Sequence, residues 1–516
     1  MSISNLGTTI MVNEARIWNH FIMKMVYNVK DRPPLGMNVV YALQQVLAIL
    51  AATILVPTII GNGMSQAAAL FGAGVGTFVY LLFTNFKSPV FLGSSFAFIG
   101  SMFAAFSGAA AAAYLGFLGL LLGAIFAGLV YVIIALIVKF FGTAWINKVM
   151  PAAVIGPTVA IIGLSLSGTA IQSVMNGAVF DGGLGAYVFD VNAGVGIVCG
   201  LVALFGTIVA SVYGGKNVKL IPFIIGIGAG YVCASIFTGI GWLSGNDALK
   251  VIDFTIFARI TEGSAWLPDF TFIKAFQGFA DLNWTYVGTI AVAYVPVAFV
   301  VFAEHLADHK NISSIIEKDL LEDPGLDKTL LGDGIGSIAG AFFGGCPNTT
   351  YGESVGCVAI TKNASISTIM IAAGMCIIIS FLAPFMLLLA SIPSCVINGV
   401  CIALYGFIAV SGLKMIQKVN LEENANLFTV STILVAGVGG FALSFAVNAT
   451  QYITLTNIAC ALILGIIVNL MVGGMSKKSV EKAQAYSAKI TAAKEEAEKA
   501  EEEEGEKAVE QAEVTE

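Results

Sequence analysis

The sequence predicts an all-α polytopic membrane protein built from two inverted repeats of seven membrane-spanning segments. Of its 516 residues, 57% are hydrophobic and only 11% are charged, whereas a soluble domain carries about 25% charged residues. Apolar windows of about 20 residues, the length that a helix needs to cross a bilayer, follow one another along most of the chain. Polar interruptions also recur at matching positions in the two halves. These observations exclude a soluble protein.

Hydropathy and helix-breaking residues predict fourteen spans. The first seven are expected at 37–60, 65–86, 88–106, 112–141, 147–170, 192–213 and 219–241. A longer polar connection, Leu243–Asn283, separates them from the second seven, expected at 284–307, 327–345, 346–362, 364–390, 394–416, 427–446 and 453–474. The third and tenth spans are the least regular of the fourteen.

The positions of lysine and arginine support an even number of spans. All but three of the 25 Lys and Arg residues fall in segments that this map places on one side of the membrane; the exceptions are Lys250, Arg259 and Lys274. Because positive residues are enriched in cytoplasmic loops, we expect both termini to be cytoplasmic. The N-terminal segment shows no cleavable signal peptide.

Two interrupted segments occupy corresponding places in the two halves. Span three opens with Ser88-Pro-Val-Phe-Leu-Gly-Ser-Ser-Phe96, and span ten opens with Cys346-Pro-Asn-Thr-Thr-Tyr-Gly-Glu353. Proline supplies no N–H and disfavours helix before itself, so each segment is expected to run extended and then start a short helix. Since seven is odd, the second repeat is inverted. Matched interruptions of this kind indicate the binding site of a transporter; the alternative is that Gly and Pro are simply common in membrane helices.

Carboxylates mark the candidate site. Glu353 lies in the polar stretch of span ten, and an ionisable residue at membrane depth is a functional-site hypothesis. Glu304 directly follows an apolar run near the end of span eight, and Asp308 shares its helix face four residues later. His305 lies on a neighbouring face. The alternative is a solvated helix end, which we expect for His309 and Lys310.

A pair of buried glutamates suits a neutral, planar ligand that bears N–H groups. Carboxylates accept such hydrogen bonds, and a protonated carboxyl can also donate one, which offers a route to proton coupling. Backbone N–H groups at short-helix starts, near Ser94–Phe96 and Glu353–Ser354, could meet the carbonyl oxygens of the ligand.

Other patterns carry less information. Gly226-x-Gly228-x-Gly230 and Gly332-x-Gly334-x-Gly336 follow no strand of a βαβ unit and are interpreted as helix-packing or span-entry glycines. The eight cysteines lack CxxC spacing and are expected to be free thiols. The tail 476–516 is rich in Ala, Glu and Lys and is expected to be a solvated cytoplasmic extension. We find no sign of a cofactor, a metal site or nucleic-acid binding.

Three motifs show a family resemblance. Phe302-Ala-Glu-His305, Leu92-Gly-Ser-Ser-Phe-Ala-Phe98 and above all Pro347-Asn-Thr-Thr-Tyr-Gly-Glu-Ser354 resemble the bacterial uracil permeases of the nucleobase–ascorbate (nucleobase:cation symporter) family. The resemblance covers about residues 30–475. It implies a proton symporter that imports uracil across the bacterial cytoplasmic membrane. Pro347-Asn348, together with Glu353, favours a pyrimidine over the purine-selective branch of the family.

The resemblance also implies a division into a core domain and a gate domain that move against each other. The expected parts are an N-terminus 1–36, core segments 37–141 and 284–390, gate segments 142–242 and 391–475, an extracellular connection 243–283 and the tail 476–516. Short β-strands of spans three and ten would cross near the substrate, and two gate domains would form a homodimer.

The implied site residues fall in two sets. Uracil would be held by the side chains of Glu304 and Glu353 and by the backbone of Phe96 and Gly352, with Ser95 and Tyr351 beside them. Proton coupling would involve Glu304, Glu353, Asp308 and His305. Asp308 departs from the family pattern, because well-studied proton-coupled members carry a histidine there.

Four alternatives remain. A purine or xanthine permease and an uncoupled nucleobase carrier would share this fold. A channel or anion exchanger of related architecture would need a cation near the crossing point, where we find none in the sequence. An intramembrane enzyme would need a recognisable set of catalytic residues, which is missing, so we expect no enzyme activity.

Overall fold

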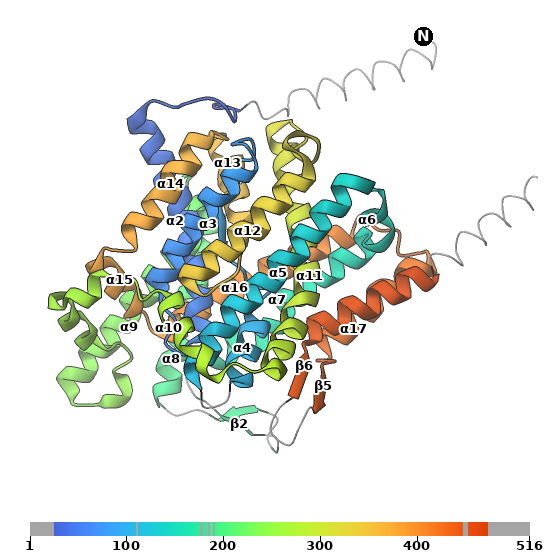
Figure 1. The fold of residues 1–516 in the computed structure, drawn as a ribbon. Coiled ribbons are helices and arrows are strands. Elements are labelled where there is room, and N and C mark those ends of the chain that lie inside the picture. The colour runs from blue at the N-terminus through green and yellow to red at the C-terminus, as the bar shows by residue number, and fades with distance from the viewer. Residues whose placement is uncertain are drawn as a thin grey trace, which may run out of the picture.

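The protein is a bundle of long apolar helices (Figure 1). The computed structural model describes residues 25–109, 112–175, 179–181, 183, 186–188, 191–446 and 452–472. Within these ranges eight helices are long and apolar enough to cross a membrane. They are α2 (Leu35–Ile60), α3 (Gln66–Phe83), α5 (Ala113–Phe141), α7 (Ala152–Val174), α8 (Val191–Tyr213), α9 (Pro222–Ser244), α11 (Trp284–Ile316) and α16 (Ser394–Ile416).

The remaining elements complete the described fold. The α-helices are α4 (Ile99–Gly108), α6 (Ala144–Val149), α10 (Thr271–Gln277), α12 (Leu326–Gly344), α13 (Gly352–Thr361), α14 (Ile366–Ile379), α15 (Ala383–Ala390), α17 (Asn424–Val438) and Asn457–Val472. Tighter or wider turns are η1 (Val218–Leu220), η2 (Asp247–Leu249), η3 (Phe254–Thr261), η4 (Gly263–Trp266), η5 (Gly278–Asp281) and η6 (Leu321–Gly325). Strand pairs are β1 (Leu92–Ser94) with β4 (Asn348–Thr350), β2 (Val179–Asp181) with β3 (Ala186–Val188), and β5 (Leu443–Ala446) with β6 (Tyr452–Leu455).

The helices pack in two groups. In the first group α12 packs on α3 and α5, α14 packs on α2 and α3, and α11 packs on α5. In the second group α16 packs on α7 and α8, α8 packs on α9, and α17 packs on α7. The groups touch each other mainly where α11 meets α7 and β6, and where α2 meets α9. Residues of both groups line the cavity described below.

Glycines allow the closest helix contacts in the first group. A Cβ atom added to Gly336 on α12 would lie 2.7 Å from the carbonyl oxygen of Gly76 on α3, and one added to Gly76 would lie 2.7 Å from that of Gly336. Small residues permit such backbone approach in lipid, where packing replaces the hydrophobic effect between helices. The interpretation of the 332–336 glycines as packing residues is therefore confirmed.

The two interrupted segments meet as a short antiparallel strand pair. Leu92, Gly93 and Ser94 of β1 pair with Thr350, Thr349 and Asn348 of β4. All six residues are buried, and pairing satisfies backbone groups that no water could reach at this depth. The expectation of extended segments that lead into short helices is confirmed. However, α4 begins at Ile99, later than the expected start near Ser94–Phe96.

The last expected spans differ from the structure. Residues 427–446 were expected to form one span, but α17 ends at Val438 and residues 443–446 form β5. Gly440 adopts a left-handed conformation (φ 71°), and the N–H of Phe441 bonds back to the carbonyl of Ala436, which terminates the helix. The expected span 453–474 likewise begins with β6 before its helix.

Two other spans depart from single helices of the expected length. Residues 364–390 form α14 and α15, which are bent by 82°; if this pair is one span, the described residues hold nine. Helix α11 continues to Ile316, nine residues beyond its expected end at 307. The eight cysteines are free thiols, as expected.

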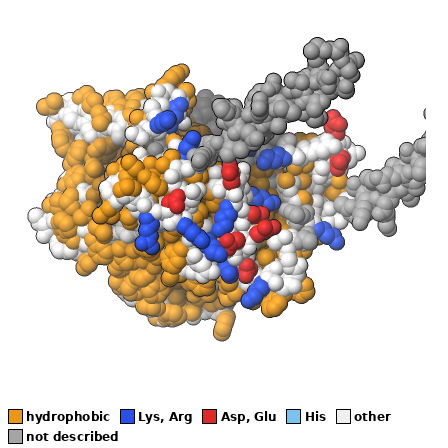
Figure 2. Space-filling view, turned by 90° about the horizontal axis from the view of Figure 1, so that it is seen from above, with side chains coloured by type: hydrophobic (Ala, Val, Ile, Leu, Met, Phe, Trp, Pro, Cys, Tyr) orange, Lys and Arg blue, Asp and Glu red, His pale blue; other side chains and the backbone are white. Residues whose placement is uncertain are grey.

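One end of the molecule carries many of its charges. The connection between α11 and α12 lies at the top of Figure 1, and η2–η4 lie at the opposite end. Seen from above, lysine, arginine and acidic side chains cluster on this face, and hydrophobic surface lies around them (Figure 2). At the α11–α12 connection, Asp323 pairs with Lys87 at 2.5 Å and with Lys318 at 2.8 Å.

A short N-terminal segment is tied to the turn that follows α13. The N–H of Val26 bonds to the carbonyl of Lys362 at 2.8 Å, and the N–H of Ala364 bonds to the carbonyl of Tyr27 at 2.9 Å. The Ser365 hydroxyl donates to the carbonyl of Asp31 at 2.6 Å. The C-terminal end of α13 is thus fixed to the chain that leads into α2.

Candidate functional site

Helix α11 presents two carboxylates on one face. Glu304 and Asp308 are one turn apart, as the i, i+4 spacing requires, and both border the same cavity. Asp308 accepts a 2.7 Å hydrogen bond from the hydroxyl of Thr350, the last residue of β4. This bond connects the helix to the strand crossing.

A third carboxylate stands at the start of α13. The chain leaves β4 through Tyr351, which is extended (φ −106°), and the helix begins at Gly352 and Glu353. The first N–H groups of a helix have no partner within it and favour negative or acceptor groups nearby. A Cβ atom on Gly352 would lie 3.8 Å from an oxygen of Asp308, so the start of α13 lies directly beside α11.

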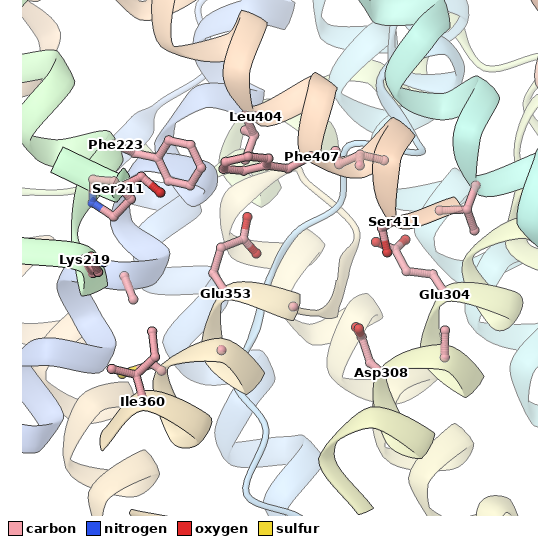
Figure 3. Close-up of a pocket in the computed structure, with 18 of the residues that line it drawn as sticks. Ser211, Lys219, Phe223, Glu304, Asp308, Glu353, Ile360, Leu404, Phe407 and Ser411 are labelled. Atoms are coloured by element: carbon pink, nitrogen blue, oxygen red, sulfur yellow. The ribbon is translucent and has the colours of Figure 1, made fainter. Parts of the chain in front are cut away.

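The cavity between the two helix groups has a volume of about 360 Å³. This is within the range of small-molecule sites, about 300–1,000 Å³. Its first wall comes from α2, α11 and α13, and its second wall comes from α7, α8, η1, α9 and α16. In Figure 3 the carboxylates of Glu304, Asp308 and Glu353 point into this space, with Phe223 and Phe407 above Glu353.

The structure separates the predicted site residues into two sets. Glu304, Asp308, Gly352 and Glu353 line the cavity. The other four predicted residues are buried outside this lining. They are Ser95, Phe96, Tyr351 and His305.

Two of these buried residues hold the strand crossing together, and Phe96 packs against α16. The N–H of Ser95 bonds to the carbonyl of Pro347 at 2.9 Å, and the hydroxyl of Tyr351 donates to the carbonyl of Ser94 at 2.9 Å. Phe96 packs its ring edge-on against Tyr405 of α16, with 5.9 Å between ring centroids. The Ser95 N–H is therefore already bonded within the protein.

His305 belongs to a buried polar cluster behind the carboxylate face. Its Nδ1 lies 2.7 Å from a carboxylate oxygen of Asp333 on α12, and its Nε2 lies 3.1 Å from the hydroxyl of Thr329. Its ring stacks on that of His309, with 4.0 Å between centroids. Asp333 and both histidines are completely buried.

The expectation of a solvated His309 is wrong. Its Nε2 lies 2.7 Å from the hydroxyl of Tyr80 on α3, and its Nδ1 donates to the carbonyl of His305 at 2.9 Å. The reason is that α11 extends to Ile316 and packs in the protein beyond its expected end. Lys310 is exposed, as expected.

Sequence reasoning missed the second wall of the cavity. Helix α16 contributes Leu404, Phe407, Ile408, Ser411 and Met415, a stripe at i, i+3, i+4, i+7 and i+11. Helix α9 adds Phe223, and η1 adds Lys219, a cation that the sequence did not place near the carboxylates. In the sequence these are ordinary residues of apolar spans, because only their helical spacing signals a shared face and not what that face borders.

The chemistry of the lining favours a neutral ligand that offers hydrogen-bond donors. Three carboxylates on one wall accept hydrogen bonds, and one lysine is present on the other. Aromatic and aliphatic side chains make up most of the rest. Such a site can orient a flat polar molecule without itself changing any covalent bond.

The fold is that of known membrane transporters. The structure resembles the transmembrane domain of the cyanobacterial bicarbonate transporter BicA, with a TM-score of 0.55, 17% sequence identity, and coverage of 84% of this chain and 97% of that one. It also resembles the murine anion transporter Slc26a9 in an inward-facing state, with a TM-score of 0.55, 9% identity, and coverage of 87% and 69%. With eight described helices that are long and apolar enough to cross a membrane, the protein is a helical, multi-pass membrane protein.

Sequence comparison identifies the family. Residues 36–446 match the model of the Permease family, Xan_ur_permease. The chain is 36% identical to the uracil permease of Bacillus caldolyticus over 453 residues. This alignment covers 87% of the chain and 95% of the relative. It is 33% identical over 445 residues to the uracil permease of Escherichia coli strain K12, with coverage of 86% and 93%. The chain belongs to this permease family, which confirms the prediction of a transporter and not an enzyme.

Proposed function

We propose that this permease imports uracil across the bacterial cytoplasmic membrane together with protons. One observation carries the proposal: Glu304 of α11 and Glu353 of α13 line the same cavity of about 360 Å³. The names of the relatives support uracil as the substrate, since those at 33–36% identity are uracil permeases.

The glutamates accept hydrogen bonds from the two ring N–H groups of uracil. Carboxylates are acceptors when ionised, and a hydrogen bond to a charged group is stronger than one between neutral groups. The carbonyl oxygens of uracil meet backbone N–H groups at Gly352 and near Phe96. Ser95 and Tyr351 support this arrangement through the strand crossing.

Protons are carried by the carboxylates of the cavity, with Asp308 and His305 as further candidates. Glu304, Glu353 and Asp308 share one small space, where like charges oppose each other's ionisation. Protonation of one carboxyl relieves this repulsion and supplies a donor for the ligand. Proton and uracil then favour the same arrangement of the site.

Transport follows from relative motion of a core domain, 37–141 and 284–390, and a gate domain, 142–242 and 391–475. The separate packing of the two helix groups supports this division. The spans form two inverted repeats of seven, with both termini cytoplasmic and 243–283 outside. Gate domains of two copies form a homodimer in the bilayer.

An anionic substrate fits this cavity less well, although both structural neighbours named above transport anions by their titles. An anion would face three carboxylates and one lysine. Desolvating a charge beside like charges is unfavourable. A neutral base avoids this repulsion.

The test is uptake of radiolabelled uracil into proteoliposomes, with and without an inward proton gradient. We expect the gradient to accelerate uptake and to drive accumulation. Uptake that only equilibrates, whatever the gradient, would retain the substrate and remove proton coupling. Uptake of radiolabelled xanthine by the same proteoliposomes, with no uptake of uracil, would point to a purine permease.

A further inference from the structure

We infer that Phe407 is the residue that recognises the flat face of the substrate, so that selectivity for an aromatic base resides in the second wall of the cavity. This inference rests on the proposed function. It assigns a different contact to each wall of the cavity. The carboxylates accept hydrogen bonds from the N–H groups at the edge of the ring, and Phe407 stacks on the face of the ring.

Phe407 presents its ring to the cavity. It lies in the middle of the α16 stripe, three residues after Leu404 and four before Ser411, both of which also line this space. The side chain is 53% exposed, although α16 packs against both α7 and α8. A large aromatic surface therefore borders the same cavity as the carboxylates.

Phe223 holds the Phe407 ring in place. The two centroids are 5.9 Å apart and the ring planes are inclined by 62°, an edge-to-face arrangement that aromatic pairs prefer. Phe223 itself is only 7% exposed, so it serves as a fixed support on α9. This contact favours the orientation in which the other side of the Phe407 ring borders the cavity.

The carboxylate of Glu353 points toward these two rings across the cavity (Figure 3). A ligand whose N–H group bonds to Glu353 must place the rest of its ring between this carboxylate and the α16 wall. Stacking on an aromatic side chain requires a planar π-system and is insensitive to the substituents that hydrogen bonding reads. The geometry therefore selects planar heterocycles over saturated ones of the same outline.

Dihydrouracil distinguishes hydrogen bonding to the carboxylates from stacking on Phe407. It keeps both ring N–H groups and both carbonyl groups of uracil, but its C5–C6 bond is saturated and its ring is not aromatic. Binding of both compounds to the purified full-length protein, by calorimetry or by displacement of radiolabelled uracil, gives a preference ratio for each variant. We would compare the wild type with Phe407→Leu and Phe407→Tyr.

We expect Phe407→Leu to reduce the preference for uracil over dihydrouracil by about five- to tenfold, the size of a lost stacking contact. Phe407→Tyr should keep the ratio within about twofold, since it retains the ring. Phe205→Leu is the matched control, because Phe205 on α8 is 57% exposed and lies outside the cavity lining. A readout based on the ratio of two ligands is insensitive to general loss of folded protein.

The experiment distinguishes failure of the role assigned to Phe407 from failure of the proposed function. If the wild type binds uracil and Phe407→Leu keeps the wild-type ratio, the role of Phe407 is refuted while the proposed function stands. If folded wild type binds no uracil, the proposed function fails, and this inference fails with it.

Discussion

The hydroxyl of Thr350 donates a 2.7 Å hydrogen bond to the carboxylate of Asp308. Thr350 ends β4, two residues before α13 begins, and Asp308 lies one turn after Glu304 on α11. This bond joins the helix that carries Glu304 to the strand that leads into the helix that carries Glu353. This relationship gives Asp308 a structural task that is separate from any part in proton transfer.

Removing this bond should weaken uracil binding. Thr350→Val keeps the shape of the side chain but leaves Asp308 without its donor, and loss of a hydrogen bond to a charged group costs about 1.5–3 kcal/mol. We expect uracil affinity, measured by calorimetry, to fall by about tenfold or more. Asp308→Asn should lower affinity too, and the double variant should lose less than the sum of both.

Thr349→Val is the control for that experiment. Thr349 is the preceding residue of β4, is equally buried, and its hydroxyl has no partner among the described residues. Replacing an unpaired buried hydroxyl by a methyl group is neutral or stabilising. Equal losses of affinity in Thr349→Val and Thr350→Val would show that strand packing, and not the bond to Asp308, sets the site.

Glu353→Gln should greatly reduce uracil binding. The amide retains the size of the carboxylate but replaces an ionised acceptor with a neutral group, and bonds to charged groups are about twice as strong. A decrease of affinity of about 10- to 100-fold is expected in equilibrium binding. Glu317→Gln, at the exposed end of α11, should bind like the wild type. Undiminished uracil binding by Glu353→Gln would remove this residue from the site.

Two measurements decide whether His305 takes part in proton coupling or only holds α11 in position. His305→Ala leaves the buried carboxyl of Asp333 without its hydrogen-bond partner, and an unsatisfied buried polar group costs about 1–3 kcal/mol, so the variant should have a lower unfolding temperature in detergent. His305→Gln can still donate to Asp333 and should recover much of that stability. If His305→Gln transports uracil but no longer responds to the proton gradient, coupling passes through His305. A normal gradient response would limit His305 to positioning α11.

The Asp323 ion pairs predict a dependence of stability on pH. Hydrogen bonds from Lys318 and then Lys87 lower the pKa of Asp323 to about 2, below the value of about 3.9 for an unfolded chain. Their contribution is therefore present above about pH 4 and is lost as the pH falls toward 2. The difference in melting temperature between wild type and Asp323→Asn should be small, since the pair is exposed, and should shrink from pH 5 to pH 2.5. Glu322→Gln, an exposed neighbour, should show no such trend; a difference that stays constant with pH would contradict the assignment.

Local features of the sequence predicted the strand crossing and the carboxylate wall. Pro89 and Pro347 disfavour helix locally, and the β1–β4 pair lies just after them. Glu304 and Asp308 had to share a face because helix geometry alone fixes the i, i+4 relation. That they share a face thus needed no knowledge of the rest of the chain, whereas the cavity that this face borders is formed by tertiary packing.

Tertiary packing determined what the sequence could not show. Phe223 and Phe407 are typical residues of lipid-spanning helices, and only the packing of α9 beside α16 brings their rings together. The pairing of His309 with Tyr80 joins residues 229 positions apart. The ends of α11 and α17 were also missed, since their lengths depend on neighbours and on Gly440.

The β1–β4 pair has a consequence for the synthesis of the protein. Strand β1 emerges from the ribosome long before its partner, so its backbone groups cannot be satisfied by β4 until the whole segment up to Thr350 has been made. Unpaired backbone in hydrocarbon is strongly unfavourable. We therefore expect the first half of the chain to be unstable in the membrane until β4 has been made and pairs with β1. A fragment that ends at Gly345 should be degraded when expressed alone and should be protected when the remainder of the chain is supplied as a second polypeptide.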